Sequence, residues 1–225
     1  MNQKEAARLI DISAVQTHHT LADIRYVVDV AKRFSFMNVH SLPAWTRTVR
    51  DMLRDTPHIL AGAPVGFPGG GHTTSVKLFE AEKLIEDGVQ EMDIVMNVGR
   101  FKSEDYEYVL GELNRIVDLT PKAILTKVII EINVLTDEEI MGACDLIMQT
   151  DADFIKTGTG WVQGSLNLAR IAAIKRKTQG RIKLKVAGGV RAKEDFEYMC
   201  GIGVERFGIN TQAALNLIQN YAPAS

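Results

Sequence analysis

A lysine at the end of a short apolar run is the first feature of this sequence that could do chemistry. Phe154 and Ile155 lead into Lys156, and the small residues Thr157 to Gly160 follow. This pattern is typical of a buried strand that opens into a loop beneath a ligand. Burial and a neighbouring cation both lower the pKa of an amine, so Lys156 is a candidate nucleophile toward carbonyl groups. A lysine that reaches from the strand end into water, or that pairs with an acid, is the competing interpretation.

Asp93 and Lys185 are two further charged residues in apolar surroundings. Asp93 lies within the segment Glu91–Asn97, where a buried carboxylate needs a cationic partner because an unpaired charge is costly away from water. Lysine and leucine alternate in Ile182–Gly189, so Lys183 and Lys185 share one face of a predicted strand. Only Lys185 is near the end of that strand, and we expect it alone to reach the active face.

Lys156, Asp93 and Lys185 together would suit Schiff-base aldol chemistry. In one polar pocket, the ammonium of Lys185 would lower the pKa of Lys156, while Asp93 and a water move protons as a carbinolamine and an enamine form. Their convergence is expected from the topology and not from any spacing in the sequence. A buried Lys-Asp-Lys ion network without a catalytic role also perturbs pKa values and stays as the alternative.

Glycine and small polar residues follow the last two predicted strands. Gly188 and Gly189 precede one predicted helix, and Asn210 and Thr211 open the final one. In barrel enzymes, free backbone N–H groups and helix N-termini at these places bind phosphate. Simple turn and N-cap chemistry, with Asn210 or Thr211 as the cap, is the alternative.

The glycine-rich segment 66–73 resembles a nucleotide-binding P-loop only in part. It follows a strand and precedes a helix, but His72 stands in the place of the lysine, and Pro68 lacks a backbone N–H. We therefore favour a flexible loop over the mouth of the active site, in which the glycines allow a close approach.

The histidines and cysteines do not indicate a metal site. The five histidines form no HExxH or similar pair, and we find no cluster of histidines and acids at the strand ends such as a metal-dependent aldolase requires. His40 ends the second predicted strand and could reach the pocket or form a satisfied hydrogen bond there. Cys144 and Cys200 are predicted to be reduced and buried. Metal and cofactor are therefore both predicted to be absent.

Strand and helix patterns alternate along the chain and indicate the frame that positions these residues. The predicted strands are Leu9–Val15, Phe36–His40, Ile59–Val65, Glu91–Asn97, Ile124–Ile130, Asp153–Lys156, Ile182–Ala187 and Arg206–Ile209. The predicted helices lie near 21–33, 43–54, 74–87, 104–118, 136–149, 165–178, 192–202 and 211–220. Eight such pairs predict an α/β fold, a closed (β/α)8 (TIM) barrel that fills residues 1–225 as a single domain. A doubly wound open sheet is disfavoured because the first strand-helix turn has no glycine fingerprint.

Composition narrows the range of partners. The 225 residues are 46% hydrophobic and 24% charged, with a net charge of −2, and no basic run is interleaved with aromatic residues, so nucleic acid is not expected as a partner. The start of the chain lacks the apolar core of a signal peptide, and no window is apolar enough to cross a membrane. We therefore expect no membrane association and a cytoplasmic location.

Taken together, several segments resemble the deoxyribose-phosphate aldolase family, in the same order and over nearly the whole chain. The segments that carry the resemblance are 66–68, 91–99, 127–131, 153–160 and 185–191. That family is a (β/α)8 class I aldolase that reversibly splits 2-deoxy-D-ribose 5-phosphate into acetaldehyde and D-glyceraldehyde 3-phosphate without a metal. The resemblance thus implies a carbon-carbon lyase with a small-molecule phosphosugar or aldehyde substrate. Barrels of this kind often pair, so a homo-oligomer is also considered.

The resemblance also implies roles for individual residues. Lys156 would form the Schiff base, Lys185 would tune it, and Asp93 would take part in proton transfer. The implied substrate-binding residues, of which the last five fall where the family binds phosphate, are Asp11, Lys127, Asn38, Thr159, Gly160, Gly188, Gly189, Asn210 and Thr211.

The chain departs from the family pattern at several positions. Asn38 stands where many members have cysteine, His40 and Ser41 replace a more usual Asn-Pro or Tyr-Pro pair, and Gly158 replaces a serine. Asn210 and Thr211 replace a pair of serines. Since several of these residues would face the substrate, a diverged Schiff-base aldolase acting on another small hydroxy-aldehyde or phosphosugar stays open. A barrel that binds a phosphosugar without catalysis is a further alternative, and the presence of Lys156 argues against it.

Overall fold

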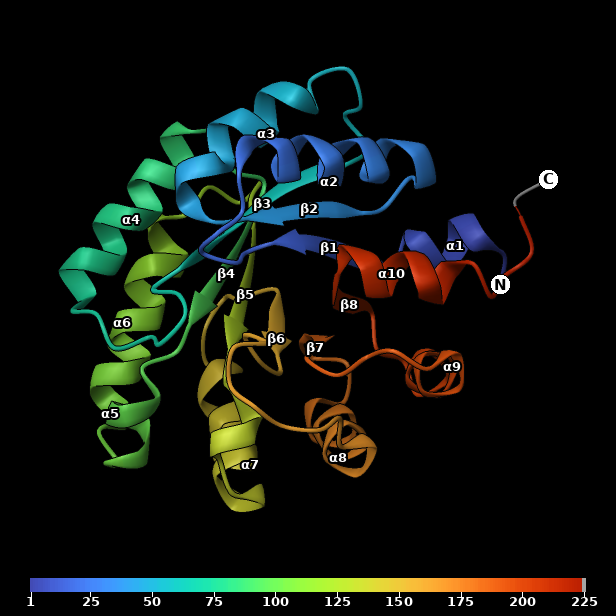
Figure 1. Cartoon of the computed structure of the whole chain (residues 1–225). Helices are drawn as coiled ribbons and strands as arrows, with labels where there is room; N and C mark the ends of the chain where they lie inside the picture. The colour runs from blue at the N-terminus through green and yellow to red at the C-terminus, as the bar shows by residue number, and fades with distance from the viewer. Residues whose placement is uncertain (224–225) are drawn as a thin grey trace.

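Eight parallel strands form a closed barrel in the order of the sequence, from β1 to β8, with helices around the outside (Figure 1). The computed structural model describes residues 1–223. The strands are β1 Ile10–Ala14, β2 Asn38–Ser41, β3 Leu60–Val65, β4 Glu91–Val95, β5 Leu125–Ile129, β6 Phe154–Lys156, β7 Lys183–Ala187 and β8 Arg206–Asn210. The predicted (β/α)8 barrel is therefore confirmed, and the open sheet is excluded.

Ten α-helices and two 3₁₀ helices connect and cover the strands within residues 1–223. The α-helices are α1 Gln3–Ala7, α2 Leu21–Phe34, α3 Thr46–Met52, α4 Thr74–Glu86, α5 Val98–Lys102, α6 Tyr106–Leu119, α7 Asp137–Ile147, α8 Leu168–Thr178, α9 Lys193–Gly201 and α10 Thr211–Ile218. The 3₁₀ helices are η1 Pro43–Trp45 and η2 Ile132–Val134.

All eight predicted helices are present, and two short ones were missed. Helix α1 begins at a capping box, in which the Asn2 side chain accepts from Glu5 N and the Glu5 side chain accepts from Asn2 N. This sequence signal was available, but five residues are too few to show a period. Helix α5 begins at Asn97, whose side chain caps it by accepting from Arg100 N.

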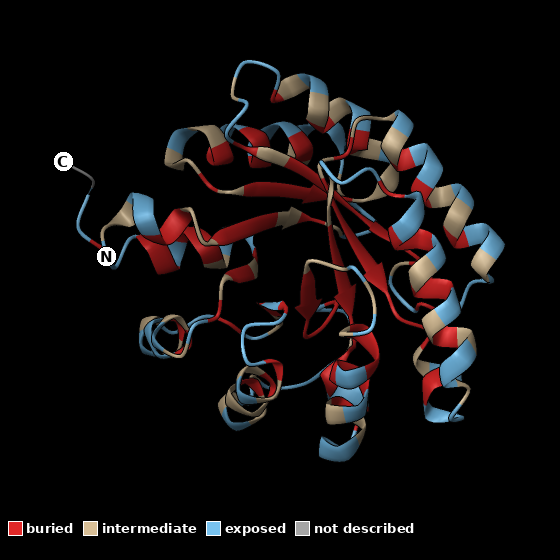
Figure 2. Ribbon diagram, turned by 180° about the vertical axis from the view of Figure 1, so that it is seen from behind, coloured by how far each residue is buried: buried red, intermediate tan, exposed pale blue. Residues whose placement is uncertain are grey.

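The strands separate a polar interior from an apolar shell. Along β1, Asp11 points into the barrel, and alternation turns its neighbours Ile10 and Ile12 toward the helices. Almost every strand residue is buried on both sides, as parallel sheets require (Figure 2). Hydrophobic packing therefore holds the helices on the outside, while charged side chains fill the centre.

Register on neighbouring strands decides which interior side chains meet. Lys156 on β6 pairs with Lys185 on β7, and Lys185 pairs in turn with Arg206 on β8. On the strands that precede β6, Asp93 on β4 pairs with Lys127 on β5. Because all strands run in one direction, their carboxyl ends form one rim, where ligands bind in folds of this type.

Other expectations about the chain are tested here as well. The N- and C-terminal segments lie side by side (Figure 1), where Gln3 N donates to Ala222 O at 2.9 Å. Cys144 is buried and Cys200 only half-buried, which corrects the expectation that both are buried; both are free. In residues 1–223, no helix is long and apolar enough to span a membrane.

Candidate active site

Lys156 lies at the end of the shortest strand, and its side chain points into the barrel. Its Nζ donates to Asp93 Oδ2 at 2.7 Å, and the lysine is 6% exposed. Strand β6 is only three residues long and buried throughout, so the chain leaves the sheet directly after Lys156. The amine is thus fixed by one carboxylate and opens on the rim of the barrel.

Lys185 shares this carboxylate with Lys156. Its Nζ donates to the same oxygen, Asp93 Oδ2, at 2.9 Å and lies 2.7 Å from Asp11 Oδ2. Lys183, two residues earlier, is exposed. The two lysines share a face of β7 but lie at different positions along it, and only Lys185 joins the cluster, as expected.

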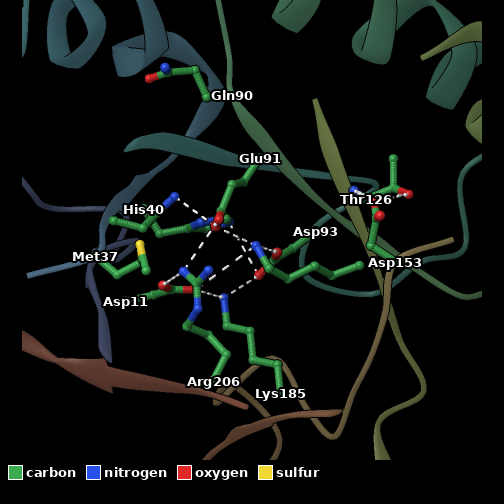
Figure 3. A network of polar contacts seen from close by, with 12 residues as sticks. Asp11, Met37, His40, Gln90, Glu91, Asp93, Thr126, Asp153, Lys185 and Arg206 are labelled. Carbon is green, nitrogen blue, oxygen red and sulfur yellow. Dashed lines mark hydrogen bonds and ion pairs between the residues drawn. The ribbon is translucent and has the colours of Figure 1, made fainter. Parts of the chain in front are cut away.

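A second layer of charge lies beneath these groups (Figure 3). Glu91 accepts hydrogen bonds from Lys127 and, at 2.9 Å, from Asn38 Nδ2. Arg206 Nη1 lies 2.6 Å from Asp11 Oδ1 and 3.3 Å from Glu91 Oε1. Figure 3 shows the side chains of Glu91, Asp11 and Arg206 pointing toward one another. The interior is thus one connected ion-pair network, in which every carboxylate has a cationic neighbour.

The pKa of Lys156 is lowered from its usual value to about 8. Burial is the main cause, and the cations of Lys185 and Lys127 add to it, while the Asp93 carboxylate opposes them. At this pKa about a tenth of Lys156 is neutral at pH 7, compared with well under a thousandth for an ordinary lysine. The site therefore holds an amine that is available for attack near neutral pH.

The other groups of the site are held in their charged forms. Burial alone would lower the pKa of Lys185, but the carboxylates of Asp11, Asp93 and Glu91 overcome it and raise this pKa. Burial would raise the pKa of Asp93, but the cations of Lys156, Lys185 and Lys127 hold that pKa well below its usual range. The pKa of Asp11 is likewise lowered, against burial, by Lys185 and Arg206. Lys156 is thus the member of the Lys-Asp-Lys group whose charge changes near neutral pH.

A cavity of about 200 Å³ opens above this cluster. The predicted site residues that line it are Asp11, Lys156, Lys185, Thr159, Gly160, Gly188, Gly189 and Asn210. The predicted residues that lie outside its lining are Asp93, Lys127, Asn38 and Thr211. Asp93 lies directly behind Lys156 and Lys185, so it is one hydrogen bond away from the cavity. Lys127 and Asn38 are placed deeper, where both donate to Glu91, and neither lines the cavity.

The rim at strands β6 to β8 offers backbone groups to the cavity. Gly160, Gly188 and Gly189 have φ angles of +79°, +92° and +83°, a conformation that residues with a side chain rarely adopt. Helix α9 begins only at Lys193, so Gly188 and Gly189 belong to a loop and do not open the helix. The N–H groups available for an anion here are therefore those of a turn.

Asn210 and Thr211 have structural roles of their own. The Asn210 side chain accepts from Ala213 N at 2.9 Å and so caps α10. The Thr211 hydroxyl lies 3.4 Å from Ser13 O. The N-cap interpretation from the sequence is thus confirmed for Asn210, which also lines the cavity.

Comparison with known proteins places the chain in a family. Residues 12–205 match the family described as DeoC/LacD family aldolase. The chain belongs to this family. A protein named deoxyribose-phosphate aldolase from Sinorhizobium medicae is 43% identical over 219 residues, which cover 97% of this chain and 88% of that protein. A protein of the same name from Klebsiella pneumoniae is 38% identical over 214 residues, or 94% and 86% of the two chains. This chain is therefore an aldolase, a carbon-carbon lyase.

Solved structures agree with this membership. The structure of an aldolase named QR15 is 33% identical and superposes with a TM-score of 0.89 over 96% of this chain and 95% of that one. The tetrameric deoxyribose phosphate aldolase from Aeropyrum pernix, 23% identical, superposes with a TM-score of 0.84 over 96% and 91% of the two chains. At this lower identity the comparison shows the shared fold.

The loop 66–73 of this DeoC/LacD family aldolase lies at the side of the cavity. Phe67 lines the cavity, and its ring packs edge-on against Trp161 with 5.6 Å between centroids. The loop is held by hydrogen bonds from Gly66 N to the Glu80 side chain at 2.6 Å and from Gly70 N to Gly66 O at 2.8 Å. The expected position at the mouth is therefore correct, and the structure shows a hydrogen-bonded turn in place of a free loop.

Glu131 supports the segment that follows Lys156. Thr159 donates to Glu131 Oε2 from its hydroxyl and, at 3.0 Å, from its backbone N–H. A Cβ on Gly158 would lie 2.8 Å from Glu131 Oε1. The glycine at this position therefore matches the close approach of the Glu131 carboxylate.

Among the polar residues that were not predicted as members of this aldolase site, Glu91, Arg206 and Glu131 bond to its predicted members. Glu91 precedes Asp93 by two residues, so the alternation that turns Asp93 inward also turns Glu91 inward. That signal was present in the sequence. Arg206 opens its strand, and nothing local distinguishes it from a surface residue. Among residues 1–223, no three His, Cys, Asp or Glu residues are arranged to hold a metal ion.

Proposed function

We propose that this aldolase reversibly cleaves 2-deoxy-D-ribose 5-phosphate to acetaldehyde and D-glyceraldehyde 3-phosphate through a Schiff base on Lys156. The observation that carries the proposal is the Lys156 amine, which has a pKa of about 8, lies at the floor of the cavity and is bonded to Asp93. The choice of substrate is supported by the relatives of this chain, which are named deoxyribose-phosphate aldolase and are up to 43% identical to it.

Imine formation begins with the neutral amine. Lys156 Nζ attacks the aldehyde carbon of the open-chain sugar, and the carbonyl oxygen takes a proton to become the hydroxyl of a carbinolamine. This hydroxyl leaves with a proton as water, and a protonated imine remains. The cation of Lys185 favours the neutral amine before attack, since it is one of the causes of the lowered pKa of Lys156.

Carbon-carbon cleavage then uses the imine as an electron sink. The bond between carbons 2 and 3 breaks, its electron pair moves toward the imine nitrogen, and the 3-hydroxyl loses its proton. D-glyceraldehyde 3-phosphate departs and an enamine remains on Lys156. A proton is then added at carbon 2, and water hydrolyses the resulting imine to release acetaldehyde and the free amine. Asp93, ionised and in contact with Lys156 Nζ, is the group we assign to these proton transfers, with a water as carrier.

Asp11 and Lys185 also face the cavity and are the groups available to bind the polar part of the sugar. The phosphate is assigned to the turn at Gly188 and Gly189 and to the start of α10 behind Asn210, where backbone N–H groups and a helix N-terminus favour an anion. Arg191 also lines this part of the cavity.

The remaining attributes are part of the same proposal. The reaction needs no metal, because the protonated imine on Lys156 is the electron sink and a carboxylate is the proton acceptor. We further propose that the protein works in the cytoplasm, with free thiols at Cys144 and Cys200, and as a homo-oligomer, as the named tetramer from Aeropyrum pernix does. The barrel is proposed to be the single domain of residues 1–225.

Borohydride trapping tests the proposal directly. The protein is incubated with 2-deoxy-D-ribose 5-phosphate, reduced, and examined by intact mass and peptide mapping. A reduced adduct on Lys156, retained in a Lys183→Ala control and lost in Lys156→Ala, is the expected result. If acetaldehyde labels Lys156 but the phosphosugar does not, the mechanism stands and the substrate is that of a diverged aldolase. If nothing labels Lys156, the proposal is wrong.

A further inference from the structure

His40 is a buried titratable residue at the cavity that the steps above do not use. It lies on β2, is 4% exposed, and lines the cavity beside Lys156. Neither ring nitrogen has a hydrogen-bond partner within residues 1–223. A buried imidazole without partners is costly, so its position calls for an explanation in terms of the working site.

One ring nitrogen of His40 faces the carboxylate at the centre of the site. Nε2 lies 3.4 Å from Asp93 Oδ2, and this is the oxygen that already accepts from Lys156 at 2.7 Å and from Lys185 at 2.9 Å. The His40 contact is longer than a hydrogen bond, and closing it requires a shift of about half an ångström. Contacts of this kind often tighten only when a reaction intermediate is bound.

Gly62 on the neighbouring strand β3 makes room for the ring. A Cβ at Gly62 would lie 2.3 Å from His40 Nδ1 and 2.8 Å from the amide atoms of Asn38. Any other residue at this position would therefore displace the imidazole. With Nδ1 against the backbone of β3, the ring presents Nε2 to Asp93.

The protonation state of His40 suits a neutral hydrogen-bond donor. The ionised groups that face it are Asp93 on β4, Lys127 on β5, Lys156 on β6 and Lys185 on β7. Burial and the three lysines lower its pKa to about 3, although Asp93 opposes them. The ring is therefore neutral at working pH and has one N–H, which can face a carboxylate without adding a positive charge beside Lys156.

We propose, on the basis of the Schiff-base function above, that His40 is a positioning residue: its Nε2–H takes up the hydrogen bond on Asp93 Oδ2 that Lys156 gives up. Lys156 must turn its lone pair toward the substrate, and as an imine it retains at most one N–H. Lys185 also contacts Asp11, so its ammonium does not serve Asp93 alone. His40 then keeps the carboxylate in place during the proton transfers.

Two amide substitutions separate this role from simple packing. In His40→Gln the amide nitrogen can occupy the place of Nε2, whereas in His40→Asn it occupies that of Nδ1. We expect His40→Gln to retain most of kcat and His40→Asn to lose about tenfold to a hundredfold, with KM changed much less in both. The pH midpoint of kcat/KM should stay near that of wild type, because a neutral group has been removed. Equal loss in the two variants, or none in either, would overturn the proposal.

Two further readouts keep the test decisive. Borohydride trapping of Lys156 in the wild type is measured first. If an adduct forms there and kcat is equal in the two variants, only the role of His40 is rejected and the proposed function stands. If no adduct forms in the wild type, both the proposed function and the role of His40 are rejected. Nitrogen-15 NMR of the wild-type ring requires no substitution. We expect His40 to be the Nε2–H tautomer and not to titrate between about pH 5 and 8. An Nδ1–H tautomer, or a titration in this range, would contradict the proposal.

Discussion

Lys156 and Lys185 stand opposite each other in register on β6 and β7, and their pKa values are shifted in opposite directions. The difference lies in the carboxylates: Lys185 touches both Asp11 and Asp93, whereas Lys156 touches Asp93 alone. Deeper in the barrel, Glu91 is matched by Lys127 and Arg206. Three carboxylates thus face three permanent cations, and the charge of Lys156 is the one in excess. The network therefore favours a neutral amine at Lys156.

Lys156→Ala is expected to abolish turnover and leave the barrel folded, because it removes the nucleophile and also the excess charge. Activity should fall below about 1% of wild type, measured as acetaldehyde release, with an unchanged circular dichroism spectrum. Lys183→Ala, which removes an exposed lysine from the neighbouring strand, serves as the matched control and should keep full activity. Residual turnover well above this level would show that Lys156 is not the nucleophile.

Lys185→Leu is expected to slow imine formation more than it weakens substrate binding. The cation of Lys185 is one cause of the lowered pKa of Lys156, so its loss should raise that pKa and move the pH profile to more alkaline values. Asp11 keeps its 2.6 Å contact with Arg206, which preserves one partner for the buried carboxylate. The rate of borohydride-trappable imine gives the measurement, with the melting temperature as a control of folding. An unchanged rate of imine formation would contradict the electrostatic role.

The sequence was sufficient for the fold and for the central three residues. Alternating strand and helix patterns specify the barrel, and the apolar surroundings of Asp93, Lys156 and Lys185 mark them as buried charges. The network beneath them was not predictable to the same extent. Glu91 could have been found from its two-residue spacing to Asp93, but its pairing with Arg206 joins residues more than a hundred positions apart and depends on closure of the barrel.

Depth along the strands was the second property that the sequence left open. Lys127 and Asn38 were expected to bind substrate, yet they lie against Glu91 below the cavity. How deep a strand residue lies below the rim depends on strand register and tilt, which local sequence patterns do not specify. The relation of Gly62 to His40 is of the same kind, because the space that a missing side chain leaves is apparent only once the two strands are side by side.

The pH dependence of kcat/KM should show a single rise that levels off above about pH 8. Attack requires neutral Lys156, whose pKa is lowered to about 8, so activity increases roughly tenfold per pH unit well below this value and becomes flat above it. Asp93 stays ionised and His40 stays neutral over the same range, since both of their pKa values are lowered. Neither of these two groups is therefore expected to add a second ionisation between about pH 5 and 8. A bell-shaped profile with an apparent pKa near 6 would indicate that another group controls the chemistry.

Chelation is expected to leave activity intact. The carboxylates next to the amine, Asp93 and Asp11, are each engaged by lysine or arginine side chains, and the proposed steps use only an amine and a carboxylate. Prolonged dialysis against EDTA, followed by the turnover assay, makes the comparison with untreated enzyme. Loss of activity that added Zn²⁺ restores would require a metal-assisted mechanism.

Asn210→Asp tests the assignment of the phosphate to the turn before α10. Aspartate caps a helix as well as asparagine does, and its charge is favourable at a helix N-terminus, so the cap on Ala213 N should be kept and stability unchanged. Because Asn210 also lines the cavity, the new charge should repel a phosphate and raise KM for 2-deoxy-D-ribose 5-phosphate about tenfold at low ionic strength, which corresponds to about 1.4 kcal/mol. The KM for 2-deoxy-D-ribose without phosphate should change little.

Asn210→Ala provides the opposite control, since it loses the cap at a cost of about 1 kcal/mol but adds no charge. Equal changes of KM for the two sugars in Asn210→Asp would place the phosphate elsewhere in the cavity.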